Sequence, residues 1–166
     1  MLKPAIMYKD QLQKKFSEVI YSDEYYYYVG YPHANTLPEF DSIENCYRWA
    51  IVKNNSENKY DENSEVIGYL AYRVDAFCNS VSSFGLFSFD PGNLQVIRDL
   101  HDHMEYLYDT YHRMEWRMIG GNHAMRGYTK FCENHNGTVH LLRDVTKDRQ
   151  GNYVDEYIFE VINSNN

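Results

Sequence analysis

The sequence has few of the residues that define several large classes of protein. Its three cysteines, Cys46, Cys78 and Cys132, are widely spaced and form no Cys-x-x-Cys pair. This argues against a disulfide framework and against a thiolate zinc site. No stretch reaches the ~20 apolar residues that a membrane-spanning helix needs, and charged residues follow Met1 too soon for a signal peptide. We therefore expect a cytoplasmic protein with no membrane partner.

Positive charge is also scarce. The chain has 16 Lys and Arg against 24 Asp and Glu, a net charge of −8, and a pI near 5.3. A protein that binds nucleic acid through phosphate contacts normally carries the opposite charge, so we expect no nucleic-acid partner. The 166 residues fit a single domain over 1–166. A chain of this length buries enough surface to fold without metal or disulfide bonds.

Common catalytic motifs are missing as well. The sequence contains no Gly-x-Gly-x-x-Gly, no Gly-x4-Gly-Lys-Ser/Thr, no His-Glu-x-x-His and no Gly-x-Ser-x-Gly. This removes the main support for a dehydrogenase, a P-loop enzyme, a zinc protease and an α/β-hydrolase. His101 and His103 flank Asp102, but helix positions two apart point ~200° away from each other. We therefore expect no metal site there.

Aromatic residues are abundant: 17 Tyr, 8 Phe and 2 Trp. A buried tyrosine hydroxyl needs a hydrogen-bond partner. The tyrosines either line a pocket or an interface, or replace phenylalanine at half-buried strand positions.

The first half of the chain indicates helices followed by an antiparallel hairpin. A helix is predicted from Asp10 to Tyr21–Ser22, with Asp10 and Gln13 as a capping box. The predicted elements around it are a short strand at Ala5–Tyr8, a strand or helix at Tyr25–Tyr28, a short helix near Glu39–Asn45, and strands at Tyr47–Lys53, Glu65–Phe77 and Val81–Phe89. Residues 54–64 are predicted to be a solvated hairpin loop, and Gly85 predicts a bulge or a close approach of another chain segment.

The second half alternates helices and strands. Apolar residues at spacings of three and four predict a helix over Leu94–Tyr111, and a strand follows at Arg113–Ile119. Asn122 is the predicted N-cap of the next helix, and Asn136-Gly137 ends it. Strands at Thr138–Thr146 and Tyr153–Ile162 complete a hairpin. The strand-helix-strand unit from Val81 to Ile119 predicts two parallel strands.

From Tyr47 to Ile162 this order resembles the GCN5-related N-acetyltransferase (GNAT) family. The segments that carry the resemblance are Glu65–Leu70 with its Gly-aromatic step, Val81–Phe89 with the helix after it, Met114–Ile119 with Gly121–Phe131, and Leu142–Asp144 with Gly151–Tyr157. The resemblance implies an α/β (α+β) fold: a mixed, mostly antiparallel sheet of six to seven strands, a parallel strand 4/strand 5 pair that splays apart, and helices on both faces. Residues 1–45 would be the variable acceptor segment, 46–162 the core and 163–166 a tail.

The family resemblance also implies acetyl-CoA as co-substrate and no metal. The pantetheine arm would pair with Leu86, Phe87, Ser88 and Phe89, and the pyrophosphate would bind where the next helix begins, at Gly92, Asn93 and Leu94. The family's phosphate loop, Gln/Arg-x-x-Gly-x-Gly/Ala, is degenerate here, because only Gly92 remains of it.

Two residues are candidates for proton transfer by the same resemblance. Tyr128 lies seven residues after Gly121, with Ala124 at plus three and the family's Asn displaced to Asn122. Tyr128 would be the general acid, or it is a core tyrosine; Asn122 and Tyr128 would also contact the cofactor. Glu115 is the candidate base, and Asp90 and Asp75 are further candidates.

The acceptor would be a primary amine of a small molecule or a protein, bound over Tyr25–Phe40. The negative charge of the protein favours a cationic acceptor, and a homodimer is conceivable. The alternative is a catalytically inactive GNAT-fold binding module. An open slot between the two parallel strands would favour the enzyme, and a slot filled by Phe87, Phe89 or Met118 would favour the module.

Overall fold

The computed structural model describes residues 1–29, 37–38, 40–41, 43–54, 64–148 and 150–165. In chain order the elements are β1 (Leu2–Pro4), the 3₁₀ helix η1 (Ala5–Tyr8), α1 (Lys9–Val19), α2 (Asp23–Val29), β2 (Cys46–Val52), β3 (Val66–Asp75), β4 (Ser80–Ser88), α3 (Leu94–Thr110), β5 (Arg113–Ile119), α4 (Met125–Asn134), β6 (Thr138–Lys147) and β7 (Tyr153–Ile162). The predicted hairpin loop at 54–64 lies mostly outside the described residues.

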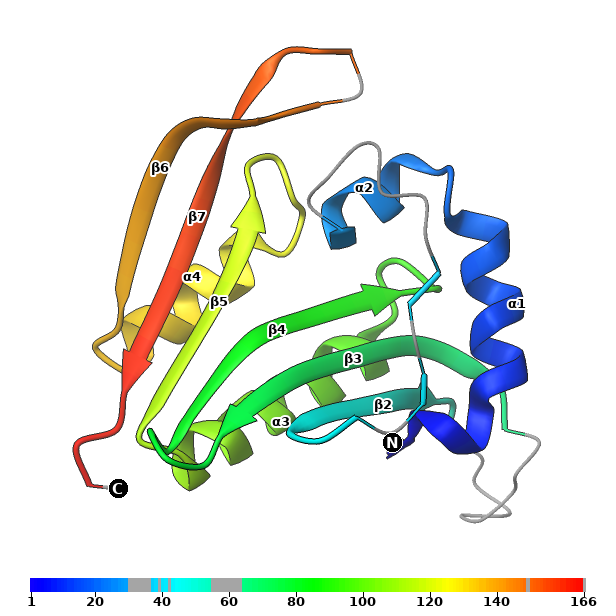
Figure 1. The fold of residues 1–166 in the computed structure, drawn as a ribbon, viewed down its shortest axis with the longest axis horizontal. Helices are drawn as coiled ribbons and strands as arrows, with labels where there is room; N and C mark the ends of the chain where they lie inside the picture. The colour runs from blue at the N-terminus through cyan, green and yellow to red at the C-terminus, as the bar shows by residue number, and fades with distance from the viewer. Residues whose placement is uncertain (30–36, 39, 42, 55–63, 149, 166) are drawn as a thin grey trace.

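The strands form one seven-stranded sheet in the order β1-β2-β3-β4-β5-β7-β6. Every neighbouring pair is antiparallel except β4 and β5. These two strands are parallel because α3 connects them as a crossover helix. This confirms the predicted mixed sheet and its parallel pair, and Figure 1 shows β4 and β5 diverging from a common end.

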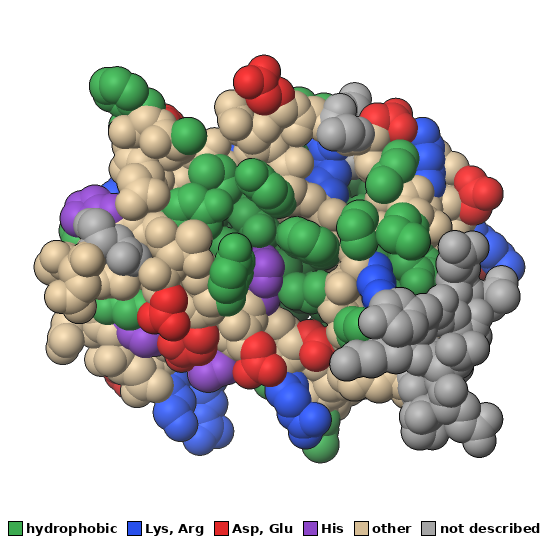
Figure 2. Space-filling model, turned by 90° about the horizontal axis from the view of Figure 1, so that it is seen from below, with side chains coloured by type: hydrophobic (Ala, Val, Ile, Leu, Met, Phe, Trp, Pro, Cys, Tyr) green, Lys and Arg blue, Asp and Glu red, His purple; other side chains and the backbone are tan. Residues whose placement is uncertain are grey.

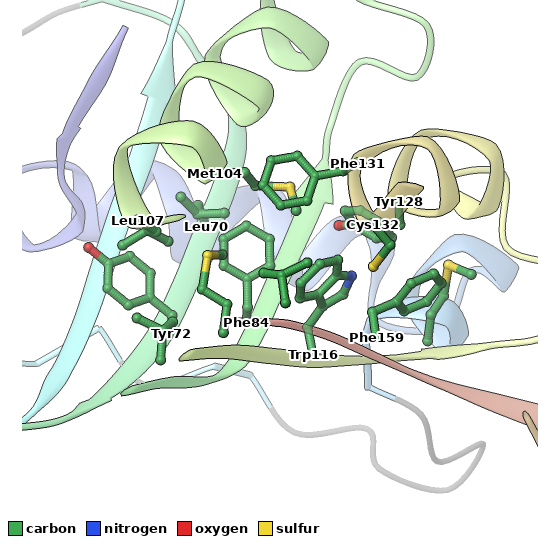
Figure 3. Packing of buried hydrophobic residues seen from close by; sticks show 14 of the residues in the cluster. Leu70, Tyr72, Phe84, Met104, Leu107, Trp116, Tyr128, Phe131, Cys132 and Phe159 are labelled. Atoms are coloured by element: carbon green, nitrogen blue, oxygen red, sulfur yellow. The ribbon is translucent and has the colours of Figure 1, made fainter. Parts of the chain in front are cut away.

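Helices cover both faces of the sheet, as predicted. On one face, α1 and α2 bury an aromatic cluster around Phe16, whose ring lies 4.9 Å from Phe89 and 5.3 Å from Phe87 between centroids. On the other face, α3 and α4 pack on Trp116, which stacks on Phe159 at 5.3 Å. Figure 3 shows this second core, with residues of α3 and α4 packed against strand residues.

Glycine is required where α4 turns into β6. The Gly137 amide donates to the Cys132 carbonyl at 2.7 Å. A Cβ at Gly137 would lie 2.5 Å from both the Glu160 carbonyl oxygen and a Val161 methyl group. The chain thus passes too close to β7 for any side chain.

We expect Gly137→Ala to lower the free energy of unfolding by at least about 2 kcal/mol, because the clash involves backbone that cannot move independently. Gly127→Ala is the matched control. Gly127 lies inside α4, and nothing lies within 4 Å of a Cβ there, so alanine should add about 0.5–1 kcal/mol through helix propensity. Urea unfolding of both variants measures the difference, and equal effects would contradict this account.

Several local predictions near the N-terminus are wrong. Ala5–Tyr8 is a 3₁₀ helix and not a strand, because the chain leaves the sheet after Pro4, which lacks the N–H that a ladder needs. The predicted capping box fails because α1 continues directly from this 3₁₀ turn. Tyr8 takes the N-cap position and makes no side-chain cap bond. Tyr25–Tyr28, ambiguous in the sequence, is helical in α2.

Two further predictions need correction. In the segment predicted as a short helix near Glu39–Asn45, the described residues form a turn and an isolated bridge between Ile43 and Cys46. The irregularity in β4 lies just before Gly85, between the pairs Ala71–Gly85 and Arg73–Ser82. Ser83 has a positive φ of 54° there. Gly85 is not a close-approach point either, since a Cβ there would lie 3.5 Å from the Tyr28 ring, an ordinary van der Waals distance.

Asn122 is not the N-cap of α4. The helix begins at Met125, with Ala124 at the N-cap position. The Asn122 side chain accepts a hydrogen bond from the Ala124 amide at 2.8 Å, so it stabilises the turn that leads into the helix.

Some large apolar side chains are exposed, among them Tyr47, Phe77 and Tyr106. Figure 2 shows apolar side chains gathered on the face seen from below, with carboxylates beside them.

The predicted homodimer stays a prediction. Across the described residues, no helix is long and apolar enough to cross a membrane.

Candidate active site

The parallel strands part along half of their length. Their register pairs are Ser80–Arg113, Val81–Met114 and Phe84–Trp116. Beyond Phe84, β4 continues to Ser88 and stays paired with β3, while β5 continues to Ile119 and stays paired with β7. The facing backbone edges of these two outer halves therefore lack a strand partner, and the two strands diverge here (Figure 1); we call the space between these edges the slot.

A cavity of about 840 Å³ lies at this slot. Its wall combines α2, the inner part of β4, the outer part of β5 and the β6–β7 hairpin; the lining residues are Tyr25, Tyr27, Tyr28, Leu37, Pro38, Ala71, Ser82, Ser83, Phe84, Gly85, Glu115, Trp116, Arg117, Met118, Ile119, Val145, Thr146 and Glu156. Tyr26 connects two of these elements, because its hydroxyl donates to the Lys147 carbonyl at 3.2 Å.

The three side chains that could have filled the slot have different positions. Phe87 and Phe89 turn into the aromatic cluster around Phe16. The Phe89 amide also donates to the Ile67 carbonyl at 2.9 Å, which holds the chain against β3. Met118 is buried in the core under α3 and α4 and forms part of the cavity wall.

Glu115 lies on the cavity wall in a network of charges. Arg113 contacts Glu115 through Nη2 at 2.6 Å and Glu160 through Nε at 2.7 Å. These two hydrogen bonds raise the pKa of the Arg113 guanidinium, Glu160 first and then Glu115. One cation thus orients two carboxylates, on β5 and on the neighbouring strand β7.

Arg117 and Glu156 form a second charged pair in the cavity wall, at 3.3 Å. Glu115 and Arg117 alternate along β5 with Trp116 and Met118, which are buried under α3 and α4. Since neighbouring residues of a strand point to opposite faces, Glu115 and Arg117 belong to the face that carries α2.

Tyr128 is in α4, on the opposite face. It is 7% exposed, and this burial raises the pKa of its hydroxyl well above the usual value of 10. Its ring lies 5.7 Å from Trp116 and 5.8 Å from Phe159 between centroids. Tyr128 therefore lies behind Trp116, which itself lines the cavity.

The predicted cofactor residues at the end of β4 form one continuous stretch. Leu86, Phe87 and Ser88 pair with Leu70, Tyr69 and Gly68 of β3. Gly92 has a φ of 85°, with open space around it, and Leu94 is 73% exposed at the start of α3.

Asn93 caps α3. Its Oδ1 accepts a hydrogen bond from the Gln95 amide at 2.8 Å, and its Nδ2 donates to Asp90 Oδ2 at 2.7 Å. The chain's own side chains therefore occupy the beginning of this helix.

This geometry fits one part of acetyl-CoA and not another. An extended arm that carries amide groups suits the unpaired outer edge of β4. A diphosphate needs hydrogen-bond donors and positive charge, whereas the beginning of α3 offers a capped amide and the Asp90 carboxylate. The diphosphate site implied by the resemblance does not fit the residues present.

The remaining candidates have structural roles. Asp75 accepts from the Phe77 and Cys78 amides in the β3–β4 turn, and these bonds, that of Cys78 first, lower the pKa of its carboxyl. His101 pairs with Glu105 at 3.5 Å. His103 is buried, which lowers the pKa of its imidazole to about 4. Within the described ranges, no three His, Cys, Asp or Glu side chains are placed to hold a metal ion.

Sequence reasoning missed the role of Arg113, Glu156 and Glu160. The alternation of Arg113, Glu115 and Arg117 along β5 was a usable signal, because it places three charged side chains on one face. Their partners on β7 lie about forty residues further along the chain, and no local pattern connects the two strands.

Solved structures with a similar fold are N-acetyltransferases by description. A GCN5-related N-acetyltransferase from Brucella melitensis is 19% identical over 97% of this chain and 74% of that one, with a TM-score of 0.61. A chimeric spermidine N-acetyltransferase from Vibrio cholerae and hSSAT is 12% identical over 74% and 72%, with a TM-score of 0.53. A probable GNAT-family acetyltransferase from Chromobacterium violaceum is 16% identical over 72% of this chain, which spans only 60% of that one, with a TM-score of 0.50.

At these identities the likeness concerns the fold: the chain has the fold of the GCN5-related N-acetyltransferases. The sequence matches no protein-family model and no curated protein.

Proposed function

We propose that this protein is an N-acetyltransferase that moves an acetyl group from acetyl-CoA to a primary amine of a small molecule or a protein. The observation that carries the proposal is the slot between β4 and β5, which opens into a cavity of about 840 Å³. A thioester tether can lie along the unpaired edge of β4, and an amine can approach from the cavity.

The two candidate proton-transfer groups lie on opposite faces of the sheet: Glu115 lines the cavity, and Tyr128 lies behind the cavity residue Trp116. Glu115, on the cavity side, would accept a proton from the amine. The nitrogen would then form a bond to the acetyl carbon, the carbon–sulfur bond would break, and Tyr128 would give its proton to the departing sulfur. The second proton lost by the nitrogen as the amide forms would restore the Tyr128 hydroxyl. Acetyl-CoA supplies the activated acetyl group. Arg113 keeps the Glu115 carboxylate in place through its second bond to Glu160.

A cationic acceptor suits the cavity best. Tyr25, Tyr27 and Tyr28 contribute aromatic rings to its wall; Glu115, which shares Arg113 with Glu160, and Glu156, which pairs with the lining residue Arg117, contribute carboxylates. Aromatic faces and carboxylates both attract ammonium groups. The spermidine acetyltransferase with this fold is consistent with such an acceptor.

The experiment is a thermal unfolding series with acetyl-CoA, followed by an assay for released thiol with a panel of amines. Acetyl-CoA at a concentration of 100 times its Kd should stabilise the protein by about 2.7 kcal/mol. Spermidine or a lysine peptide should release thiol faster than the acidic amine glutamate. If millimolar acetyl-CoA neither raises the melting temperature nor releases thiol with any amine, the proposal is wrong.

The second candidate function is a catalytically inactive binding module with the same fold. The capped beginning of α3 favours it, because Asp90 and Asn93 occupy the implied diphosphate site. The thiol assay separates the two functions, since a module releases no thiol even where an amine or a thioester binds.

A further inference from the structure

We infer that this chain recognises its thioester donor by the pantetheine arm and gains little from the diphosphate, and that Asp90 sets this preference. The inference rests on the proposed acetyltransferase function and adds the chemistry by which the donor is selected. It predicts that donors truncated after the arm bind about as well as the whole cofactor.

The first argument is the hydrogen bonding at the beginning of α3. A helix start can hold phosphate because its first amides lack partners. Here the Gln95 amide is bound by Asn93 Oδ1 at 2.8 Å, and the Asn93 amide donates to the Asp90 carbonyl at 3.1 Å. Two of the amides that a phosphate would use are already bound within the chain.

The second argument is the position of the Asp90 carboxylate. Its Oδ2 accepts from Asn93 Nδ2 at 2.7 Å, and its backbone carbonyl accepts from the Asn93 amide at 3.1 Å. Asp90 is thus held against the cap of α3. A carboxylate there takes advantage of the positive end of the helix dipole, and it repels a second anion at the same place.

The third argument is the charge around the beginning of α3. Residues 88–97 contain no Lys or Arg, and the first cation along α3 is Arg98. The Gln95 side chain donates to the Val52 carbonyl at 2.7 Å and to Asp99 at 3.1 Å, and the N-terminal ammonium of Met1 pairs with the same Asp99 carboxylate. Lys53, just after β2, pairs with Glu65 at 3.5 Å. Asp90, which has no ion pair among the described residues, therefore supplies the negative charge that disfavours a diphosphate.

Binding in the slot requires no negative charge on the donor. The pantetheine arm carries amide groups and no charge, so neither Asp90 nor Asp99 opposes it. The unpaired edge of β4 from Gly85 to Ser88 offers backbone donors and acceptors to these amides. Affinity should therefore come from the arm.

The test compares pantetheine, 4′-phosphopantetheine and CoA by titration calorimetry under reducing conditions. For the unaltered protein the three dissociation constants should agree within about tenfold, because the phosphates add little net attraction. In Asp90→Asn, CoA and 4′-phosphopantetheine should bind about three- to tenfold more tightly, while pantetheine should bind as before.

Asp102→Asn is the matched control. Asp102 is an exposed carboxylate further along α3, so its removal changes the net charge equally and leaves the beginning of the helix intact. All three dissociation constants should stay the same in this variant. An equal gain in affinity for CoA in both variants would show that the effect depends on overall charge and would overturn the role of Asp90.

The remaining outcomes separate the inference from the proposed function. If CoA binds the unaltered protein more than about tenfold tighter than pantetheine, the diphosphate is recognised and the inference fails while the proposed function stands. An unchanged affinity for CoA in Asp90→Asn also overturns it. If none of the three compounds binds, the acetyltransferase function fails, and the inference fails with it.

Discussion

Tyr128→Phe is expected to lower kcat about 100-fold or more, the usual range for the loss of a general acid, with no change in the affinity for acetyl-CoA. Burial raises the pKa of Tyr128, so its hydroxyl stays protonated below the usual tyrosine pKa of 10. The loss should therefore be the same across the pH range. Phenylalanine keeps the ring that packs on Trp116 and Phe159.

Tyr72→Phe is the control for this substitution. Tyr72 is buried in the same core, and burial raises the pKa of its hydroxyl to about 12. Tyr72 lies on β3, which does not border the slot, and its ring stacks on Tyr47 of β2 at 5.3 Å between centroids. Its kcat should be unchanged. If Tyr128→Phe and Tyr72→Phe have the same kcat as the unaltered protein, Tyr128 is a core residue and the departing sulfur takes its proton elsewhere.

Glu115→Gln is the second substitution with a large expected effect. We expect kcat/KM to fall about 100-fold, because glutamine cannot accept the proton of the amine. Steady-state rates with one amine measure the effect.

Glu160→Gln separates catalysis from the charge network. Both Glu115 and Glu160 bind Arg113, so each variant removes one of its ion pairs, but only Glu115 lines the cavity. If Glu115 is the base, the kcat/KM of Glu160→Gln should stay within a few-fold of the value for the unaltered protein. Equal losses in the two variants would show that the network, and not Glu115 as a base, supports activity.

The sequence was a good guide wherever one local pattern determined the structure. The apolar spacing of three and four predicted the long helix that forms over Leu94–Thr110, and the strands Arg113–Ile119 and Tyr153–Ile162 have their predicted bounds. The crossover between Val81 and Ile119 was enough to predict the parallel pair. Such features depend on periodicity and chain connectivity, which are written directly in the sequence.

The sequence was a poor guide where side chains chose between two partners. Asn93 was expected to help hold a phosphate, and its side chain instead caps α3 and binds Asp90. Asn122 was expected to cap a helix, and it stabilises the preceding turn. Short polar side chains can bond to nearby backbone in several ways, so the outcome depends on how neighbouring elements pack.

The candidate site could also be predicted only in part. The position of the slot followed from the order of elements, but the arrangement around it depends on contacts between distant segments. Arg113 pairs with Glu160 on the neighbouring strand β7, and Tyr26 meets Lys147 from a helix more than a hundred residues earlier. Neither contact leaves a trace in the local sequence.

Amide hydrogen exchange along β4 tests the central claim most directly. The slot lets a thioester tether bond to the backbone edge that β5 leaves unpaired beyond Phe84. With acetyl-CoA at saturation, exchange should slow for the amides between Gly85 and Ser88 that point away from β3. Exchange in the β3–β4 turn at Phe77 and Cys78 should not change. If acetyl-CoA binds while exchange between Gly85 and Ser88 stays the same, the donor lies elsewhere and the account is wrong.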